Sequence, residues 1–244
     1  MVWVLMIFAV LALGGAAGCI WYRHRLGQEI GLMASVETSR AADVAGLVPG
    51  TMAEVKGMLR CAAPLIAEFS KVPCAWHKSE IQREIVYYTR GSDGKSERKT
   101  RTEPVHSNTR FSPCSVEDAS GSVALNLTGA EVEGESVVNR REPEARGVAG
   151  TVISIALGGN ESSTLIYNET ILTHDIPVYV LGEVQADGSV GKPAAGSKNR
   201  VFVVSRKSEE ERAQDLAGTR LWLLVGAIVL FAVAGILGYF AVRI

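Results

Sequence analysis

Two long apolar stretches without a charged residue bracket the chain, at 2–22 and at 221–242. An α-helix rises about 1.5 Å per residue, so the second stretch would extend about 33 Å, enough to cross a hydrocarbon core of about 30 Å. In lipid the backbone polar groups must be satisfied within the segment, which favours a helix. We therefore predict a transmembrane helix over 221–242.

The first apolar stretch, over 1–22, has two interpretations. The run from Leu13 to Cys19 resembles a lipoprotein cleavage site, with a cysteine after small residues. However, no Lys or Arg precedes the apolar run, as a signal peptide would require. The run also continues through Trp21 and Tyr22, whose rings suit a membrane interface. A second transmembrane helix over 1–22 is the favoured interpretation, and a signal peptide is the alternative.

The residues between these stretches have a soluble composition and change character at about residue 50. Met33, Val36, Val44 and Leu47 partly follow helical spacing, which predicts a juxtamembrane helix and linker over 23–50. Short β-type runs follow over 51–206. We predict strands at 54–59, 74–81, 85–90, 95–102, 121–128, 136–139, 152–157, 165–172, 178–184 and 200–205.

Turn signals separate these strands. Gly91-Ser-Asp-Gly94 predicts a tight hairpin, and Asp187-Gly188 another turn. Gly121 to Thr128 alternates apolar and polar residues, which is typical of a half-buried strand, whereas Val178 to Val184 is apolar on both faces and should be central. The predicted fold is a mostly β domain, a small barrel or sandwich, inserted between two transmembrane helices.

The stretch over 207–220 predicts a second juxtamembrane helix. Ser208 and Glu211 have the spacing of a capping box, and Glu209 and Glu210 would favour the positive end of the helix dipole. Since no proline separates this stretch from Leu221, we expect one continuous helix into the membrane.

Charge and cysteine content indicate which class of partner and which cellular compartment the chain favours. The formal net charge is −1, which indicates no nucleic-acid partner. Three cysteines between the apolar stretches give no disulfide framework and mildly favour a reducing compartment. Basic residues near the membrane ends gather on the side of the middle domain, which predicts a cytoplasmic domain with both termini outside. These are Arg23, Arg25, Arg206, Lys207, Arg212 and Arg220, against Arg243 alone on the other side.

Three stretches in this order carry a resemblance to a known family. They are PLIAEFSKVPCAWHKSEI (64–81), FSPCSVEDASGSVALNLTGAEV (111–132) and YNETILTHDIPVYVLGEV (167–184). Together, between two membrane helices, they resemble the GIDE or beside-a-membrane family, whose known eukaryotic members are membrane-anchored E3 ubiquitin ligases. The resemblance covers roughly 50–242 and implies a GIDE-like β domain over 51–206.

The chain departs from those ligases in one respect. They carry a zinc-binding RING after the second membrane helix, which needs about eight Cys and His ligands. Here no cysteine follows Cys114, and only Arg243 and Ile244 follow the second apolar stretch. We therefore expect no ubiquitin transfer by this chain alone, and a binding or scaffold role at the membrane with an unidentified protein partner. A component of ubiquitin-ligase activity, or an envelope enzyme with an unrecognised site, is the alternative.

The side chains that could act in catalysis or bind a metal are better explained by structural roles. We therefore predict no catalytic, cofactor-binding or metal site and no cofactor. Cys74 and His77, three apart on a predicted strand, should face opposite sides. Cys74 and Cys114 should be small core residues. Asp118 and Gly121 fit a turn. Glu169 and Glu183 should lie on solvated strand faces, and His106 and His174 are isolated.

The first predicted hairpin is basic, and the region after it is acidic. The basic residues are Lys78, Arg83, Arg90, Lys95, Arg98, Lys99, Arg101 and Arg110. They could lean on anionic lipid of the bilayer. They could instead protect an edge strand from pairing with other chains, which is the favoured interpretation.

Overall fold

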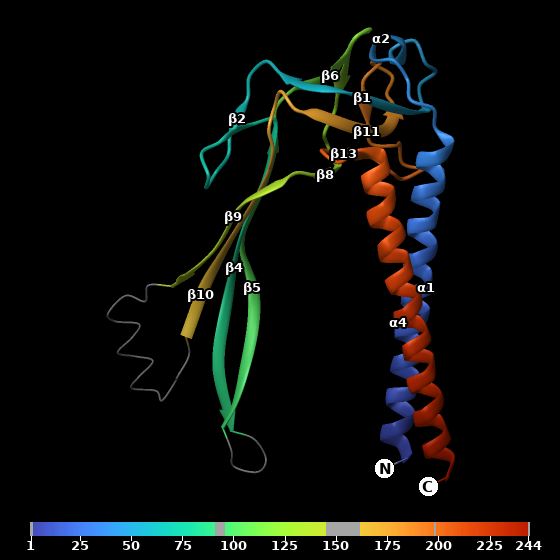
Figure 1. The fold of residues 1–244 in the computed structure, drawn as a ribbon. Coiled ribbons are helices and arrows are strands. Elements are labelled where there is room, and N and C mark those ends of the chain that lie inside the picture. Colours follow the sequence, from blue (N-terminus) through green and yellow to red (C-terminus); the bar gives the residue numbers. More distant parts are fainter. Residues whose placement is uncertain (1, 91–95, 145–161, 198, 244) are drawn as a thin grey trace.

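The computed structural model describes residues 2–90, 96–144, 162–197 and 199–243. Two long helices, α1 (Val2–Ser35) and α4 (Glu209–Arg243), run antiparallel side by side, so that both ends of the chain lie together (Figure 1). Small side chains are buried where the two backbones approach, namely Ala9, Ala12, Ala16, Ala227, Ala234 and Ala241. Both helices are long and apolar enough to cross a membrane.

Each of the two helices is continuous from its membrane-spanning part to its end at the barrel. The helical part of the predicted juxtamembrane helix and linker over 23–50 is the end of α1, which continues unbroken to Ser35 because no proline or capping signal interrupts it after Tyr22. Only the short α2 (Ala41–Val44) follows before the first strand. The continuous C-terminal helix is confirmed. At its start the Glu211 amide donates to Ser208 Oγ and the Ser208 amide donates to Glu211 Oε2, both at 3.2 Å.

The strands nearest the helices close into a small barrel. β1 pairs with β6, β6 with β7, β7 with β12, β12 with β11, and β11 returns to β1, while β13 and β8 extend the sheet beyond β11. Their bounds are β1 (Met52–Cys61), β6 (Cys114–Asp118), β7 (Gly121–Leu125), β8 (Glu131–Glu133), β11 (Pro177–Val184), β12 (Val190–Gly191) and β13 (Val203–Ser205). Of the two predicted alternatives, barrel or sandwich, the structure has a barrel, with β11 central as expected.

The core lies inside this barrel. Side chains that point inward from β1, β6, β7 and β11 are almost fully buried and form one cluster with α2. Its members include Val44, Val55, Leu59, Val116, Val123, Val180 and Val204. The alternation seen over Gly121–Leu125 is therefore the inward–outward alternation of a barrel wall, although β7 ends three residues earlier than predicted.

A second sheet of four long strands projects from the barrel, and we call it the arm. Its order is β5 (Ser96–Phe111), β4 (Trp76–Arg90), β10 (Ser162–Leu172) and β9 (Glu135–Pro143). The two predicted strands at 74–81 and 85–90 are one strand from Trp76, and the predicted return at 95–102 continues to Phe111. A β-bulge lies between Ile81 and Gln82. The predicted turn at 91–94 and the predicted strand at 152–157 lie outside the described residues.

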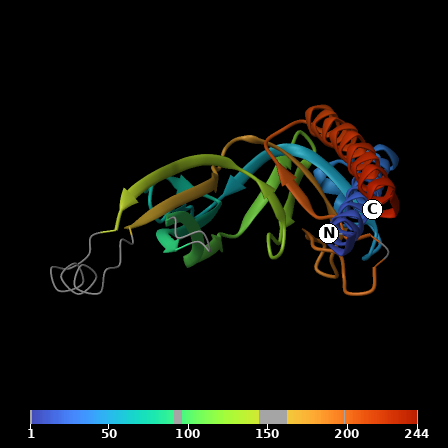
Figure 2. The ribbon, with the colours of Figure 1, turned by 90° about the horizontal axis from the view of Figure 1, so that it is seen from below.

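The arm and the helix pair leave the barrel in the same direction (Figure 1). Seen from below, they stay apart, with the barrel between them (Figure 2). A short ribbon of β2 (Leu65–Ile66) and β3 (Pro73–Cys74) lies at the base of the arm.

Candidate functional site

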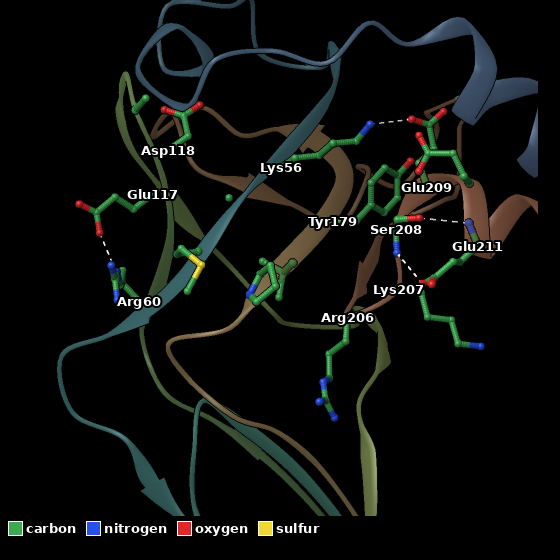
Figure 3. A pocket seen from close by; sticks show the side chains of 16 residues that line it. Lys56, Arg60, Glu117, Asp118, Tyr179, Arg206, Lys207, Ser208, Glu209 and Glu211 are labelled. Atoms are coloured by element: carbon green, nitrogen blue, oxygen red, sulfur yellow. Dashed lines mark hydrogen bonds and ion pairs between the residues drawn. The ribbon is translucent and has the colours of Figure 1, made fainter.

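A groove of about 760 Å³ lies where β1, β11 and the start of α4 meet (Figure 3). Gly57 and Met58 of β1 and Pro177 and Val178 of β11 give it apolar lining. Gly57 is required here by packing, because a Cβ at this position would lie 2.4 Å from the carbonyl oxygen of Glu117. The groove therefore combines a close-packed strand floor with a helix N-terminus at one side.

Charged residues surround the groove and are tied to one another. Lys56 Nζ lies 2.7 Å from Glu209 and 3.2 Å from Glu54, while the Tyr179 hydroxyl donates to Glu54 at 3.1 Å. Burial alone would lower the pKa of Lys56, but the hydrogen bonds to Glu209 and Glu54 raise it above its ordinary value. Burial and the Glu54 carboxylate raise the pKa of Tyr179. Both groups therefore stay protonated at neutral pH.

The other basic side chains of the groove are also paired with carboxylates. Arg60 contacts Glu117 at 2.7 Å and Asp175 at 2.6 Å. Arg206 pairs with Glu135, and Lys207 with Asp215, both at 2.5 Å. The lining also holds five carboxylates, those of Glu117, Asp118, Glu209, Glu210 and Glu211. With four basic side chains and five acidic ones, the rim is slightly acidic.

Beside the groove, Arg212 joins the helix pair to the barrel. Its guanidinium is only 2% exposed and lies 2.6 Å from Glu29 of α1, 3.3 Å from Glu131 and 2.5 Å from Glu133, both of β8. A buried arginine needs such partners, because an unpaired charge would be costly. This cluster fixes both helices and the barrel relative to one another.

Glu169 is buried, so the prediction of a solvated strand face is wrong. It is 0% exposed and lies under the loop between β2 and β3. The amides of Phe69 and Ser70 donate to it at 2.7 Å, and the Ser79 hydroxyl at 2.8 Å. Burial alone would raise the pKa of Glu169, but the donors from Ser70, Phe69 and Ser79 lower it.

Glu183 is likewise buried, and the Ala194 amide donates to it at 3.0 Å. Neither glutamate has its hydrogen-bond partner within its own strand: the donors to Glu169 are Phe69, Ser70 and Ser79, and the donor to Glu183 is Ala194. A period-two pattern identifies an inward position only when the residue is apolar.

The structure separates most of the other candidates. Cys74 lies in β3 and His77 in β4, and both are buried. Burial raises the pKa of Cys74 to about 11 and lowers that of His77. Cys114 is a core residue, as predicted, and burial raises its pKa to about 12. His106 faces Glu68 at 3.0 Å, and His174 faces Asp175 at 2.6 Å.

The turn predicted at Asp118 and Gly121 is confirmed. Asp118 accepts hydrogen bonds from the Ser120 hydroxyl and from the amides of Ala41, Ser120 and Gly121, which lower its pKa to about 2. Asp118 therefore ties the β6–β7 turn to α2.

The basic residues Arg98, Lys99 and Arg101 are exposed on β5, which is an edge strand of the arm. This placement fits the favoured interpretation of edge protection, and both edge protection and contact with lipid stay predictions. Across 2–90, 96–144, 162–197 and 199–243, no group of three or more His, Cys, Asp or Glu side chains is arranged to hold a metal ion.

Comparison with known proteins gives one match. The model of the GIDE family, described as an E3 ubiquitin ligase, matches residues 84–238, from within β4 to within α4. No curated protein and no solved structure matches the chain. The family match covers more than half of the sequence and includes two of the three stretches that carried the resemblance. The chain therefore belongs to the GIDE family.

Proposed function

We propose that this GIDE-family chain is a membrane-anchored binding module that holds a segment of a partner protein in the groove between β1, β11 and α4. The observation that carries the proposal is the lining of that groove, which pairs an apolar floor with a slightly acidic rim. The role is non-catalytic binding or scaffolding close to the bilayer.

Aromatic residues at both ends of the helices support the membrane anchor. Tyr22 of α1 and Trp222 of α4 are exposed, as are Trp3 and Tyr239 toward the other ends of the same helices. At about 1.5 Å per residue, Trp3 and Tyr22 lie about 28 Å apart along α1, and Trp222 and Tyr239 lie about 26 Å apart along α4. Amphipathic rings settle at the two faces of a bilayer, whose core is about 30 Å thick.

The occupant that fits the groove is a basic segment with an apolar side chain. Met58 and Pro177 would take the apolar side chain. Each basic side chain of the lining already has a carboxylate partner, so Lys or Arg of the partner would meet the exposed carboxylates of Glu210 and Glu211 at the rim, of which Glu211 also accepts a hydrogen bond from the Ser208 amide. Electrostatic complementarity of this kind chooses partners more than it adds affinity.

Peptide binding to the full chain in lipid nanodiscs tests this proposal. One fluorescent peptide alternates Leu and Lys, and a second of equal length has Glu in place of Lys. We expect the Lys peptide to bind at least about tenfold more tightly, which equals about 1.4 kcal/mol. Met58→Lys should abolish that preference, whereas Val105→Lys on the exposed arm should not. Equal binding of both peptides, or an unchanged Met58→Lys variant, would overturn the proposal.

The family description favours a second candidate, a component of ubiquitin-ligase activity. In that role the groove would hold a substrate or a separate RING protein. Ubiquitin transfer assayed with the purified chain, with and without an added RING protein, distinguishes the two candidates. Transfer that depends on this chain would favour the ligase component, and its absence in both assays would leave the binding module.

For the orientation we propose a barrel on the cytoplasmic side of the membrane. The excess of Lys and Arg at the barrel end of the helices supports it, because basic residues are retained on the cytoplasmic face.

A further inference from the structure

Two cysteines face each other where the chain leaves the barrel for the arm. Cys61 ends β1 and Cys114 begins β6, and the two are direct partners in the antiparallel ladder. The intervening residues, 62–113, include β2, β3, β4 and β5. The pair therefore lies at the root of the arm, with both thiols free.

The hydrogen bonds of β1 bring these side chains close together. The Leu59 amide donates to Ile176 at 2.8 Å, and its carbonyl accepts from Asp175 at 2.7 Å, so both backbone groups point away from β6. This direction repeats at every second residue, which makes Cys61 and Cys114 a non-hydrogen-bonded pair. Such pairs have Cα atoms about 4.5 Å apart, within the range of about 4.4 to 6.8 Å that a disulfide accepts.

The pair is also open to solvent at one side. Cys61 is partly exposed, whereas Cys114 is 8% exposed in the core. A shallow groove of about 420 Å³ reaches both and is lined by Arg60, Ala62, Pro113, Ser115 and Asp175. A small molecule can therefore approach Cys61 first.

We propose that Cys61 and Cys114 are a redox-responsive pair that forms a reversible disulfide by exchange with a low-molecular-weight disulfide. The Cys61 thiolate attacks one sulfur of the small disulfide, and the other half leaves as a thiolate that takes up a proton. Cys114 then loses its proton and attacks the Cys61 sulfur, which releases the second half as a thiol. The protein loses two electrons and two protons, and the small disulfide becomes two thiols.

Cys74 is the competing partner, but its position disfavours it. It is fully buried, its ladder partner is Leu65, and it packs in a separate cluster with Ala67 and Ile171. The bond between Cys61 and Cys114 would close the loop that contains the first hairpin of the arm. It would therefore tie this hairpin to the barrel and limit its movement relative to the helices.

Mass spectrometry of the full chain tests the pair. The chain in detergent is equilibrated with reduced and oxidised glutathione, alkylated and cut with trypsin. We expect peptide 61–71 joined to peptide 111–140, lighter than their sum by two hydrogens, while peptide 72–78 carries the alkyl group. The oxidised chain should unfold at a temperature higher by about 5 °C or more.

Cys74→Ala should leave the joined peptides unchanged, whereas Cys61→Ser and Cys114→Ala should each abolish them. The unmodified chain gives the decisive result whether or not the variants fold. A bond between Cys61 and Cys74, glutathione retained on Cys61 alone, or three thiols that are all alkylated would overturn the proposal.

Discussion

Buried charges set the chemistry of this protein at the scale of single residues. Among the described residues, Glu54, Glu169, Glu183 and Arg212 are charged side chains with at most 4% exposure. Each has a hydrogen-bond or ion-pair partner outside its own strand or helix. These contacts act alongside buried apolar clusters, such as that of Met33 of α1 with Tyr179 and Leu181 of β11.

Replacing Arg212 by Met should destabilise the chain by about 3–5 kcal/mol, because Glu29, Glu131 and Glu133 would lose their buried counter-ion. Urea unfolding of the purified chain in detergent, followed by tryptophan fluorescence, measures the change. Arg206→Met is the matched control, since its exposed pair with Glu135 should contribute about 1 kcal/mol or less. Equal stability of the two variants would contradict the role of Arg212.

Glu169→Gln should cost about 1–3 kcal/mol at pH 7, because the new amide group would face a backbone N–H of Phe69 or Ser70. The folded-state pKa of Glu169 is lowered, so its contribution is full above its unfolded pKa of about 4.3 and is lost as the pH falls further.

The difference between the Glu169→Gln variant and the natural chain should therefore shrink below about pH 4.3. Unfolding measured at pH 7 and at pH 3 would show this. Glu142→Gln, at a half-exposed carboxylate of the arm, should change stability at neither pH. A pH-independent difference for Glu169→Gln would argue against an ionised carboxylate in the fold.

At the scale of elements, the sequence predicted those strands that have one buried face. Over Gly121–Leu125 the apolar residues point into the barrel, so their period of two was visible. The arm was only partly predictable. β5 is an edge strand whose side chains are mostly exposed, so residues 103–111 show no alternation, and Pro104 interrupts the pattern.

Barrel closure and the groove could not be predicted for a different reason. β12 has only two residues, and its single pair with β7, Val190 with Leu125, joins residues far apart in the sequence. The groove likewise needs β1, β11 and α4 together. Local spacing carries no information on such contacts, whereas the capping box at Ser208 is local and was predicted.

Gly57→Ala should destabilise the barrel by about 1–3 kcal/mol, because the added Cβ would lie 2.4 Å from the Glu117 carbonyl and push β1 away from β6. Thermal unfolding by circular dichroism measures this. Gly218→Ala is the matched control, since it meets no atom within 4 Å in the interior of α4 and should stabilise by about 0.5–1 kcal/mol. A neutral Gly57→Ala variant would contradict the close approach of the two strands.

At the scale of the whole molecule, the antiparallel helices place both chain ends on one side and the barrel on the other (Figure 1). Both helices are long and apolar enough to span a membrane. The orientation then rests on the basic residues at the barrel end.

A single exposed cysteine tests this orientation. Thr100→Cys on β5, in a chain with its natural cysteines replaced, should react with a membrane-impermeant maleimide only after cell lysis, because the barrel is expected in the cytoplasm. A cysteine added at Val242 should show the opposite pattern and serves as the control. Labelling of Thr100→Cys in intact cells would reverse the proposed orientation.

The arm is long compared with its distance from the membrane. The fifteen residues of β4 extend about 50 Å, whereas α1 continues only about 20 Å beyond Tyr22. An arm strictly parallel to the helices would carry Arg98, Lys99 and Arg101 into hydrocarbon, where each charge is costly. In a flat bilayer we therefore expect the arm to lean away from the helix axis.

Because the Arg212 cluster joins the helices to the barrel, the thickness of the bilayer would affect the position of the arm. A membrane thinner than the apolar helices makes them tilt, commonly by about 20°. Because α4 has no joint between membrane and barrel and Arg212 fixes α1 beside it, the barrel must rotate with them. When the arm, which is about 50 Å long, turns through about 20°, its far end moves by about 17 Å. The length of the lipid chains would therefore set the height of the end of the arm above the membrane surface.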